Sequence, residues 1–183
     1  MDKKIDFLYA SILDTQATIR AIDVKSGFLF VLLFSPIYTF TNITHLHLAI
    51  LNEPEWLHCM IVANFSIWIL AITSLLMSVA AISNPSNHVA GANEVGSFYG
   101  GYLFSVNYLD VFVNRKKTST KTVLQEMSAL PENDANIISE LTFEKIKLSY
   151  IRTVKMKRFT FCIYSTYVWM ATGILLYVLC LQK

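Results

Sequence analysis

The run MIVANFSIWILAITSLLMSVAAI, residues 60–82, contains no Asp, Glu, Lys or Arg and is long enough to cross a membrane as a helix. The hydrocarbon core of a bilayer takes about 20 mostly apolar residues in helical form. Two further runs meet this length, GFLFVLLFSPIYTFTNITHL at 27–46 and FCIYSTYVWMATGILLYVLCL at 161–181. The three runs together predict an integral membrane protein.

The composition agrees with that class, because 54% of the 183 residues are hydrophobic and only 15% are charged. The predicted fold is an all-α membrane protein with three transmembrane helices, an N-terminal cytosolic helix and a cytosolic helical segment, in which the last helix is long and continuous into the membrane. The predicted parts are the N-terminal cytosolic helix at 1–26, a transmembrane hairpin at 27–82 with spans about 27–46 and 60–82, the cytosolic segment at 83–158 and the third transmembrane helix at 159–183.

The basic residues predict the orientation of the three spans. With three spans, the N-terminus and the 83–158 segment share one side of the membrane, and this side holds every Lys and Arg except Lys183. Basic residues near spans remain in the cytoplasm. We therefore expect a multi-pass membrane protein with a cytoplasmic N-terminus and a C-terminus on the opposite side of the membrane.

Residues 3–25 show the apolar spacing of an amphipathic helix. Asp23 falls on or beside its apolar stripe, directly before the first span. A carboxylate in that place needs a partner. Lys25 and the basic cluster before the third span are the two candidates, and we assign Asp23 and Lys25 a structural or gating role.

Helix signals also recur before the third span. Residues 118–127 are helical in pattern, with Ser119 or Thr120 as the N-cap, and Asp134 is a suitable N-cap for the next helix. From that point the chain has no Gly or Pro until Gly173. The third span is therefore expected to be the end of one long helix that begins in the cytoplasm.

Inside the first two spans, a proline and a row of small residues have structural consequences. Pro36 predicts a kink, tolerated where neighbouring helices cover the freed carbonyl. Ala71, Ser74 and Ser78 recur at near-helical spacing and predict a close helix contact. Three spans without a polar lining cannot hold an aqueous pore in one copy. Any permeabilisation would need either several copies or disorder at the boundary between protein and lipid, and we expect a homo-oligomer.

The sequence lacks the signatures of several enzyme classes: it has no Walker loop, dinucleotide-binding glycine fingerprint, zinc-protease motif or nucleophile elbow. No ionisable residue interrupts the spans, which argues against an ion-coupled transporter. A metal site at the outer-loop histidines and a Cys59–Cys180 disulfide are minor alternatives. We expect no enzymatic activity, no metal and no cofactor.

Three stretches, taken in order, carry a family resemblance. They are AIDVKSG at 21–27, against the first span; Phe98-Tyr99-Gly100, after the second span; and the basic LSYIRTVKMKR at 148–158, which leads into the last span. In motif, order and topology they resemble the small transmembrane effectors of bacterial anti-phage signalling, chiefly the Pycsar type. The resemblance covers most of the chain.

The resemblance implies a function. Such an effector stays inactive until a nucleotide cyclase encoded beside it senses phage and makes a cyclic pyrimidine mononucleotide, cyclic UMP or cyclic CMP. The messenger, bound as an activating ligand, then triggers disruption of the inner membrane and abortive infection. The implied partners are the lipid bilayer, the nucleotide and the functionally coupled cyclase, with no nucleic acid.

A cyclic mononucleotide needs positive charge and an aromatic face. The candidate ligand-binding residues are Phe98, Tyr99, Gly100, Tyr150, Arg152, Lys155 and Arg158. The same basic cluster also fits simple anchoring to lipid phosphates. Two other functions remain open, a membrane scaffold that binds only a protein partner and a small channel or transporter subunit without a nucleotide ligand.

Overall fold

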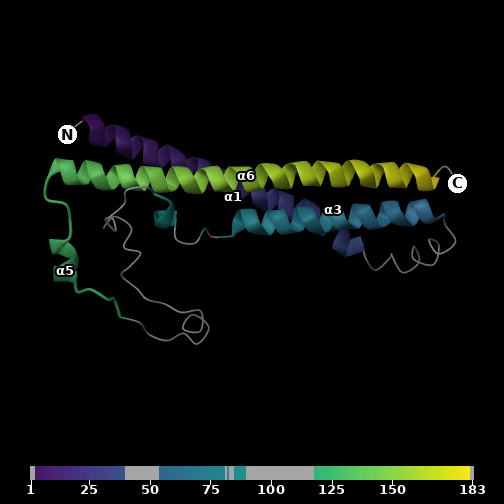
Figure 1. Ribbon diagram of the computed structural model, residues 1–183, viewed down its shortest axis with the longest axis horizontal. Helices are drawn as coiled ribbons and strands as arrows, with labels where there is room; N and C mark the ends of the chain where they lie inside the picture. The colour runs from purple at the N-terminus through teal and green to yellow at the C-terminus, as the bar shows by residue number, and fades with distance from the viewer. Residues whose placement is uncertain (1–2, 40–53, 81, 83–84, 90–117, 182–183) are drawn as a thin grey trace. The chain divides into compact units, whose positions relative to one another are not determined.

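The computed structural model describes residues 3–39, 54–80, 82, 85–89 and 118–181. The regular elements in these ranges are α1 (Lys3–Thr39), α3 (Glu55–Val79), the short 3-10 helix η2 (Pro85–His88), α5 (Val123–Ser128) and α6 (Asp134–Leu181) (Figure 1). The described ranges contain no strand. The all-α prediction is therefore confirmed, and so is the long last helix, since α6 runs for 48 residues without a break.

Helices α1 and α6 each contribute to two units. Unit 1 comprises residues 1–16 and 83–150, and unit 2 comprises residues 17–82 and 151–183. Most of the three predicted spans belong to unit 2, and most of the predicted cytosolic residues belong to unit 1. The expected separation of a cytosolic helix from the first span is not marked by a helix end, because α1 is continuous from Lys3 to Thr39.

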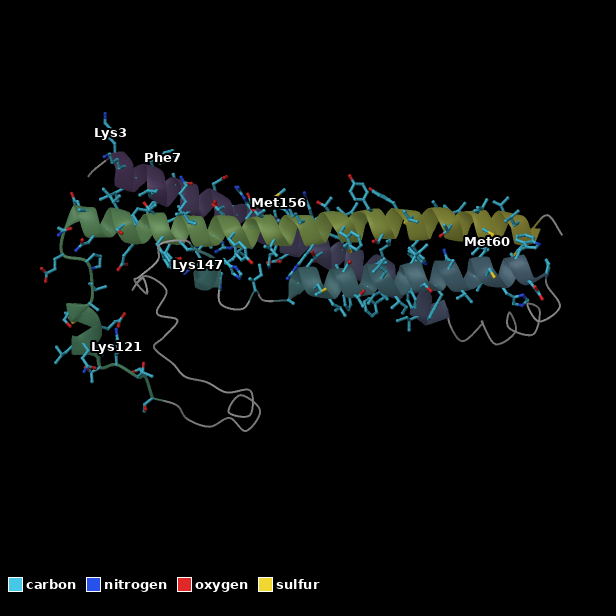
Figure 2. The ribbon with its side chains drawn as sticks, viewed as in Figure 1. Lys3, Phe7, Met60, Lys121, Lys147 and Met156 are labelled. Carbon is cyan, nitrogen blue, oxygen red and sulfur yellow. The ribbon has the colours of Figure 1, made fainter. Side chains whose placement is uncertain are left out.

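Two of the described helices, α3 and α6, are long and apolar enough to cross a membrane. In each, only 17% of the most apolar window is buried inside the structure. A core helix of a water-soluble protein is mostly buried, so this exposure is consistent with a membrane setting for the two helices. Figure 2 shows side chains extending outward along both helices. The first predicted span includes residues 40–46, which lie outside the described residues.

The ends of α5 and α6 differ from the sequence prediction. Asn133, rather than Asp134, caps α6: its side-chain oxygen accepts a hydrogen bond from the Asn136 amide at 2.8 Å, and Asp134 is the first helical residue. Helix α5 starts after Thr122, whose hydroxyl and backbone amide form a reciprocal pair with Gln125. Such a capping box satisfies two otherwise unpaired donors, which is why this helix starts later than the apolar pattern suggested.

The helix α1 continues through Pro36, whose ring nitrogen carries no hydrogen for the Leu32 carbonyl. The Ser35 hydroxyl donates to that carbonyl at 2.8 Å. The next carbonyl, of Leu33, accepts from the Trp68 indole of α3 at 2.8 Å. The freed Leu32 carbonyl is therefore satisfied within α1. The neighbouring helix α3 donates its hydrogen bond to the next carbonyl, that of Leu33.

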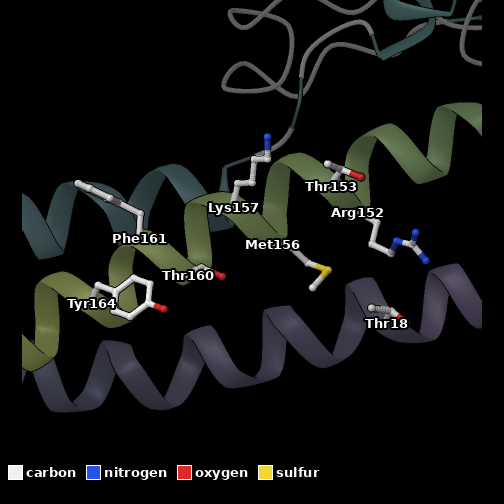
Figure 3. A pocket seen from close by; sticks show the side chains of 8 residues that line it. All are labelled: Thr18, Arg152, Thr153, Met156, Lys157, Thr160, Phe161 and Tyr164. Carbon is white, nitrogen blue, oxygen red and sulfur yellow. The ribbon is translucent and has the colours of Figure 1, made fainter.

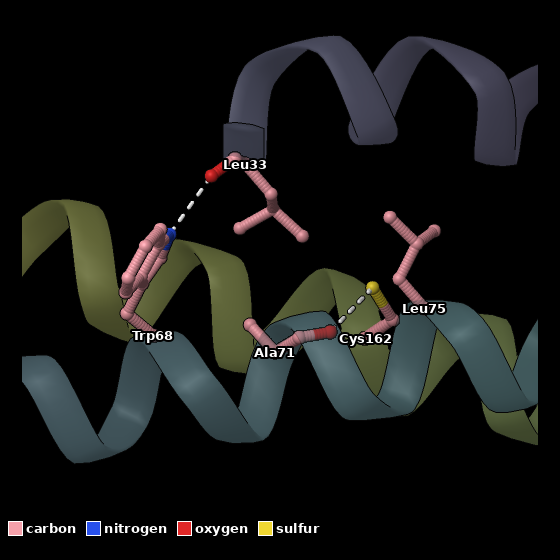
Figure 4. Packing of buried hydrophobic residues seen from close by; sticks show 5 residues of the cluster. All are labelled: Leu33, Trp68, Ala71, Leu75 and Cys162. Carbon is pink, nitrogen blue, oxygen red and sulfur yellow. Dashed lines mark hydrogen bonds between the residues drawn. The ribbon is translucent and has the colours of Figure 1, made fainter. Parts of the chain in front are cut away.

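The core of unit 2 joins α1, α3 and α6. It consists of Leu33, Trp68, Ala71, Leu75 and Cys162, all at most 8% exposed (Figure 4). At the edge of this core, the half-buried Asn64 side chain donates to the Thr172 hydroxyl at 2.6 Å and to the Trp169 carbonyl at 3.0 Å. Polar side chains of this kind hold helices together where water is absent.

The small residues predicted to lie at a helix contact do so. Ala71 and Ser78 are fully buried and Ser74 is 9% exposed. The contact is within one chain, because the Ala71 carbonyl accepts from the Cys162 thiol and Ser78 meets Ser26. This row is therefore occupied without a second copy.

In unit 1, apolar residues of α1 and α6 are buried at helical spacing. They are Ile5, Leu8 and Ile12 of α1 and Leu141 and Leu148 of α6. The Lys145 ammonium lies 5.0 Å from the centre of the Phe7 ring, which places these two helix segments side by side. The amphipathic stripe predicted for residues 3–25 is thereby confirmed at Ile5, Leu8 and Ile12, which are buried.

Candidate functional site

An ion pair joins α1 to α6 in unit 2. The Lys155 ammonium donates a hydrogen bond to the Asp23 carboxylate, with 2.6 Å between Nζ and Oδ1. The Lys155 side chain is only 11% exposed, whereas that of Asp23 is 43% exposed. The expectation that Asp23 finds a basic partner is confirmed, and the partner belongs to the cluster before the third span rather than being Lys25. The gating role stays a prediction.

Two further polar contacts join α3 to α1 and to α6, within three residues of Asp23 and of Lys155. The hydroxyls of Ser26 and Ser78 lie 3.3 Å apart, with both residues fully buried. The Arg158 guanidinium donates to the Met77 carbonyl at 2.9 Å. Because this carbonyl belongs to the last turn of α3, it has no donor within that helix. A cation in this place also interacts favourably with the helix dipole.

We call these contacts the junction: Asp23–Lys155, Ser26–Ser78 and Arg158–Met77. They lie where the uncharged stretches of α1 and α6 begin, after Lys25 and after Arg158. Each contact links two of the three helices α1, α3 and α6. The junction therefore holds α1, α3 and α6 together, and one of its members is the partly exposed carboxylate of Asp23.

An open groove of about 830 Å³ lies between α1 and α6 in unit 2. One of its residues comes from α1 and the others come from α6, and together they include two cations and four hydroxyl groups. They are Thr18, Arg152, Thr153, Met156, Lys157, Thr160, Phe161 and Tyr164 (Figure 3). We call it the Arg152 groove.

The Arg152 groove changes character along α6. In Figure 3, Arg152 and Met156 extend from α6 toward α1, where Thr18 lies, and Lys157 extends to the other side of α6. Phe161 and Tyr164 follow at the end that enters the uncharged stretch. A planar guanidinium, which suits phosphate oxygens, thus precedes an aromatic surface, and the arrangement fits an anion with a flat or apolar part.

The structure redistributes the ligand-binding residues predicted from sequence. Arg152 lines the groove, whereas Lys155 is bound to Asp23 and Arg158 to the end of α3. Tyr150 belongs to unit 1, where its ring stacks on His88 with 4.5 Å between ring centres. Phe98, Tyr99 and Gly100 lie outside the described residues. Of the four candidates that the structure describes, only Arg152 lines the groove.

Sequence reasoning missed the other groove residues. Lys157 belonged to the basic cluster, but Thr153, Thr160 and Tyr164 were not considered. Their spacing could have indicated a shared surface, because residues three, four or seven apart lie on one face of a helix. Thr18 could not have been found this way, since only the packing of α1 against α6 brings it to the groove.

Unit 1 contains a buried carboxylate, that of Glu144 on α6. Glu144 is 1% exposed, one of its oxygens is bound to Lys147, and the other, Oε2, has no hydrogen-bond partner. Burial raises the pKa of this carboxyl, and the hydrogen bond and charge of Lys147 lower it by less. Burial therefore disfavours the charged form of Glu144.

The minor alternatives from sequence find no structural support among the described residues. No group of three His, Cys, Asp or Glu side chains in the described ranges could hold a metal ion. His45 and His47 lie outside these ranges. Cys59 and Cys180 are both free and exposed, so the suggested disulfide is not formed.

No protein family model, curated protein sequence or solved structure matches this chain.

Proposed function

We propose that this protein is a membrane effector of anti-phage defence that a cyclic pyrimidine nucleotide, cyclic UMP or cyclic CMP, activates from the cytosolic side. In this proposal the chain is a multi-pass protein of the bacterial inner membrane, acts as a homo-oligomer and has no enzymatic activity. Its motif order supports the family assignment, and the two apolar helices support the membrane setting.

The observation that carries the proposal is the place of the Arg152 groove beside the junction. Arg152 precedes Lys155 by three residues on α6, so the two lie about 4.5 Å apart along the helix axis. An anion held between Arg152 and Thr18 touches both α1 and α6. The junction fixes these same two helices through Asp23 and Lys155.

Activation then follows from differential affinity. A ligand shifts a conformational equilibrium only as far as it binds one state better than the other. If the groove holds the nucleotide best with α1 and α6 in a different arrangement, binding weakens the Asp23–Lys155 pair and alters the contacts of α3. Membrane damage then comes from several rearranged copies, because a single copy supplies no polar channel.

Membrane potential in bacterial cells, followed with a potential-sensitive dye, tests the proposal. The parent chain should depolarise the membrane only when cyclic UMP or cyclic CMP is supplied. Arg152→Gln should raise the nucleotide concentration needed by at least tenfold, and Arg152→Lys by less, because an ammonium keeps the charge without the planar fork. Arg20→Gln is the matched control, since Arg20 is exposed on α1 and does not line the groove.

Three outcomes contradict the proposal, each in a different way. Depolarisation by the parent chain without any nucleotide indicates a channel that no messenger controls. Absence of depolarisation with either nucleotide, in cells that contain the protein in their membrane, indicates a scaffold. Equal responses of the Arg152→Gln and Arg20→Gln variants place the ligand site outside the Arg152 groove.

A further inference from the structure

A second groove between α1 and α6 has a different chemistry from the first. It encloses about 530 Å³ and is apolar or aromatic over most of its length, with Phe28, Leu32, Phe159 and Met170 among its walls. Lys25 is the only charged residue among the described residues that line it. We call it the Lys25 groove.

The charge at the mouth of this groove has no described counter-charge. The nearest acid in sequence, Asp23, is bound to Lys155. Among the described residues, no carboxylate forms an ion pair with Lys25, which is exposed. The Thr166 hydroxyl inside the groove donates to the Cys162 carbonyl and is satisfied. The groove therefore combines one available cation with a long apolar surface.

The groove has the length and position of one bilayer leaflet. Its α6 wall runs from Phe159 to Met170, which is about 16 Å at 1.5 Å per residue. Half of a hydrocarbon core about 30 Å thick is about 15 Å. Lys25 and Phe159 mark the edges of the uncharged stretches of α1 and α6, so the cation lies at the level of the lipid head groups when these helices span a membrane.

We propose that the Lys25 groove holds one anionic phospholipid of the cytosolic leaflet. Its phosphate group contacts the Lys25 ammonium, and one acyl chain lies along Phe28, Leu32 and Met170. A cyclic nucleotide suits this groove poorly, because a polar ribose and base would face apolar walls. The inference rests on membrane insertion of α1 and α6 and needs no messenger.

Such a lipid contacts the same two helices that the Asp23–Lys155 pair connects. It adds apolar contact on a face that the chain leaves open, since Phe28 is 75% exposed. The lipid thereby becomes part of the resting packing of α1 against α6. Membranes poor in anionic lipid should hold the two helices together less firmly.

Native mass spectrometry of the full chain in detergent, with phosphatidylglycerol or phosphatidylcholine added, tests the proposal. We expect one retained phosphatidylglycerol per chain, bound about fivefold more tightly than phosphatidylcholine, as is typical of one basic residue facing an anionic lipid. Lys25→Gln should remove this preference, and the control Arg20→Gln should keep it.

A second variant tests the acyl-chain part separately. Leu32→Trp leaves Lys25 in place but fills the groove, so it should reduce retention of both lipids. Inorganic phosphate at 10 mM should not displace the lipid, because it satisfies the cation without filling the apolar walls. Equal binding of the two lipids by the parent, an unchanged preference in Lys25→Gln, or displacement by phosphate each overturns the proposal. These outcomes leave the messenger experiment unaffected, because no nucleotide is present.

Discussion

Lys155 and Asp23 are 132 positions apart and form a hydrogen-bonded ion pair whose two ends differ sharply in exposure. The lysine end is 11% exposed and the aspartate end 43%. When one charge of an ion pair is removed, the loss of stability depends on how well water solvates the charge that remains. A buried ammonium without a partner is expensive, whereas a half-exposed carboxylate can be solvated by water.

This asymmetry predicts unequal effects of the two single substitutions. Asp23→Asn leaves the Lys155 charge in a dry site and should lower the free energy of unfolding by about 3 kcal/mol, the low end for a broken buried pair. Lys155→Met leaves an exposed carboxylate and should cost about 1 kcal/mol or less. Thermal or denaturant unfolding in detergent, followed by circular dichroism, measures both.

The double variant Asp23→Asn/Lys155→Met tests whether the unpaired Lys155 charge causes the loss of stability in Asp23→Asn. It removes both charges, so it should recover most of the stability lost in Asp23→Asn alone. If junction opening activates the protein, Asp23→Asn should also depolarise membranes without nucleotide. Equal costs for the two single variants would show that the pair behaves as a surface ion pair.

The bond from the Trp68 indole to the Leu33 carbonyl predicts a second measurable cost. Trp68→Phe keeps most of the ring but removes the donor, and should destabilise the protein by about 1 kcal/mol. Trp56→Phe is the matched control in the same helix, since Trp56 is 50% exposed. The two variants should separate in a thermal unfolding series. A loss as large in Trp56→Phe would mean that aromatic area, not the hydrogen bond, matters.

The small-residue row of α3 makes a third prediction. Ala71 is fully buried against the other helices of its own chain, so Ala71→Leu should overpack the contact and cost about 1–3 kcal/mol. Ala63→Leu is the control, because Ala63 is exposed on the same helix. The melting temperature of the monomeric fraction decides the question. If Ala71→Leu changed only the oligomeric state, the row would serve a contact between copies instead.

The topology gives a fourth prediction. A reporter joined after Lys183 should report a periplasmic location, and one inserted next to Glu132 a cytosolic location, because otherwise nearly all basic residues would face outward. Glu132 is exposed and precedes the capped start of α6, so the insertion leaves the helix intact. A periplasmic signal at Glu132 would contradict the proposed orientation, and equal signals at both sites would contradict three spans.

The long helices could be predicted from sequence because their determinants are local. The absence of Gly and Pro ahead of Gly173 indicated a continuous α6, and uncharged runs indicated the apolar segments. The partner of Asp23 was left open between Lys25 and the distant cluster. Helix geometry already disfavoured Lys25, because residues two apart do not face each other; the choice of Lys155, however, depends on how α1 packs on α6.

The candidate ligand site was harder to predict because charge and aromaticity do not reveal which groups are already engaged. Tyr150 suited an aromatic platform but stacks on His88. Arg158 suited an anion site but binds the last turn of α3. Only the packed structure separates these residues from Arg152, and it also adds Thr18 from another helix.

The buried Glu144 predicts a distinct dependence of stability on pH. Burial raises the pKa of this carboxyl above its ordinary value, so the folded state favours the protonated form more than the unfolded state does. Its contribution to stability is therefore fully present below the ordinary pKa of a glutamate, and is lost as pH rises through the raised pKa.

Glu144→Gln removes this titration while keeping the shape of the side chain. The difference in unfolding temperature between the parent and Glu144→Gln, measured from pH 4 to pH 8, should therefore change with pH, because the parent loses stability relative to the variant as pH rises. Glu132→Gln, at an exposed position, should follow the parent over the whole range. A constant difference between the parent and Glu144→Gln across this range would show that Lys147 fully compensates the buried charge.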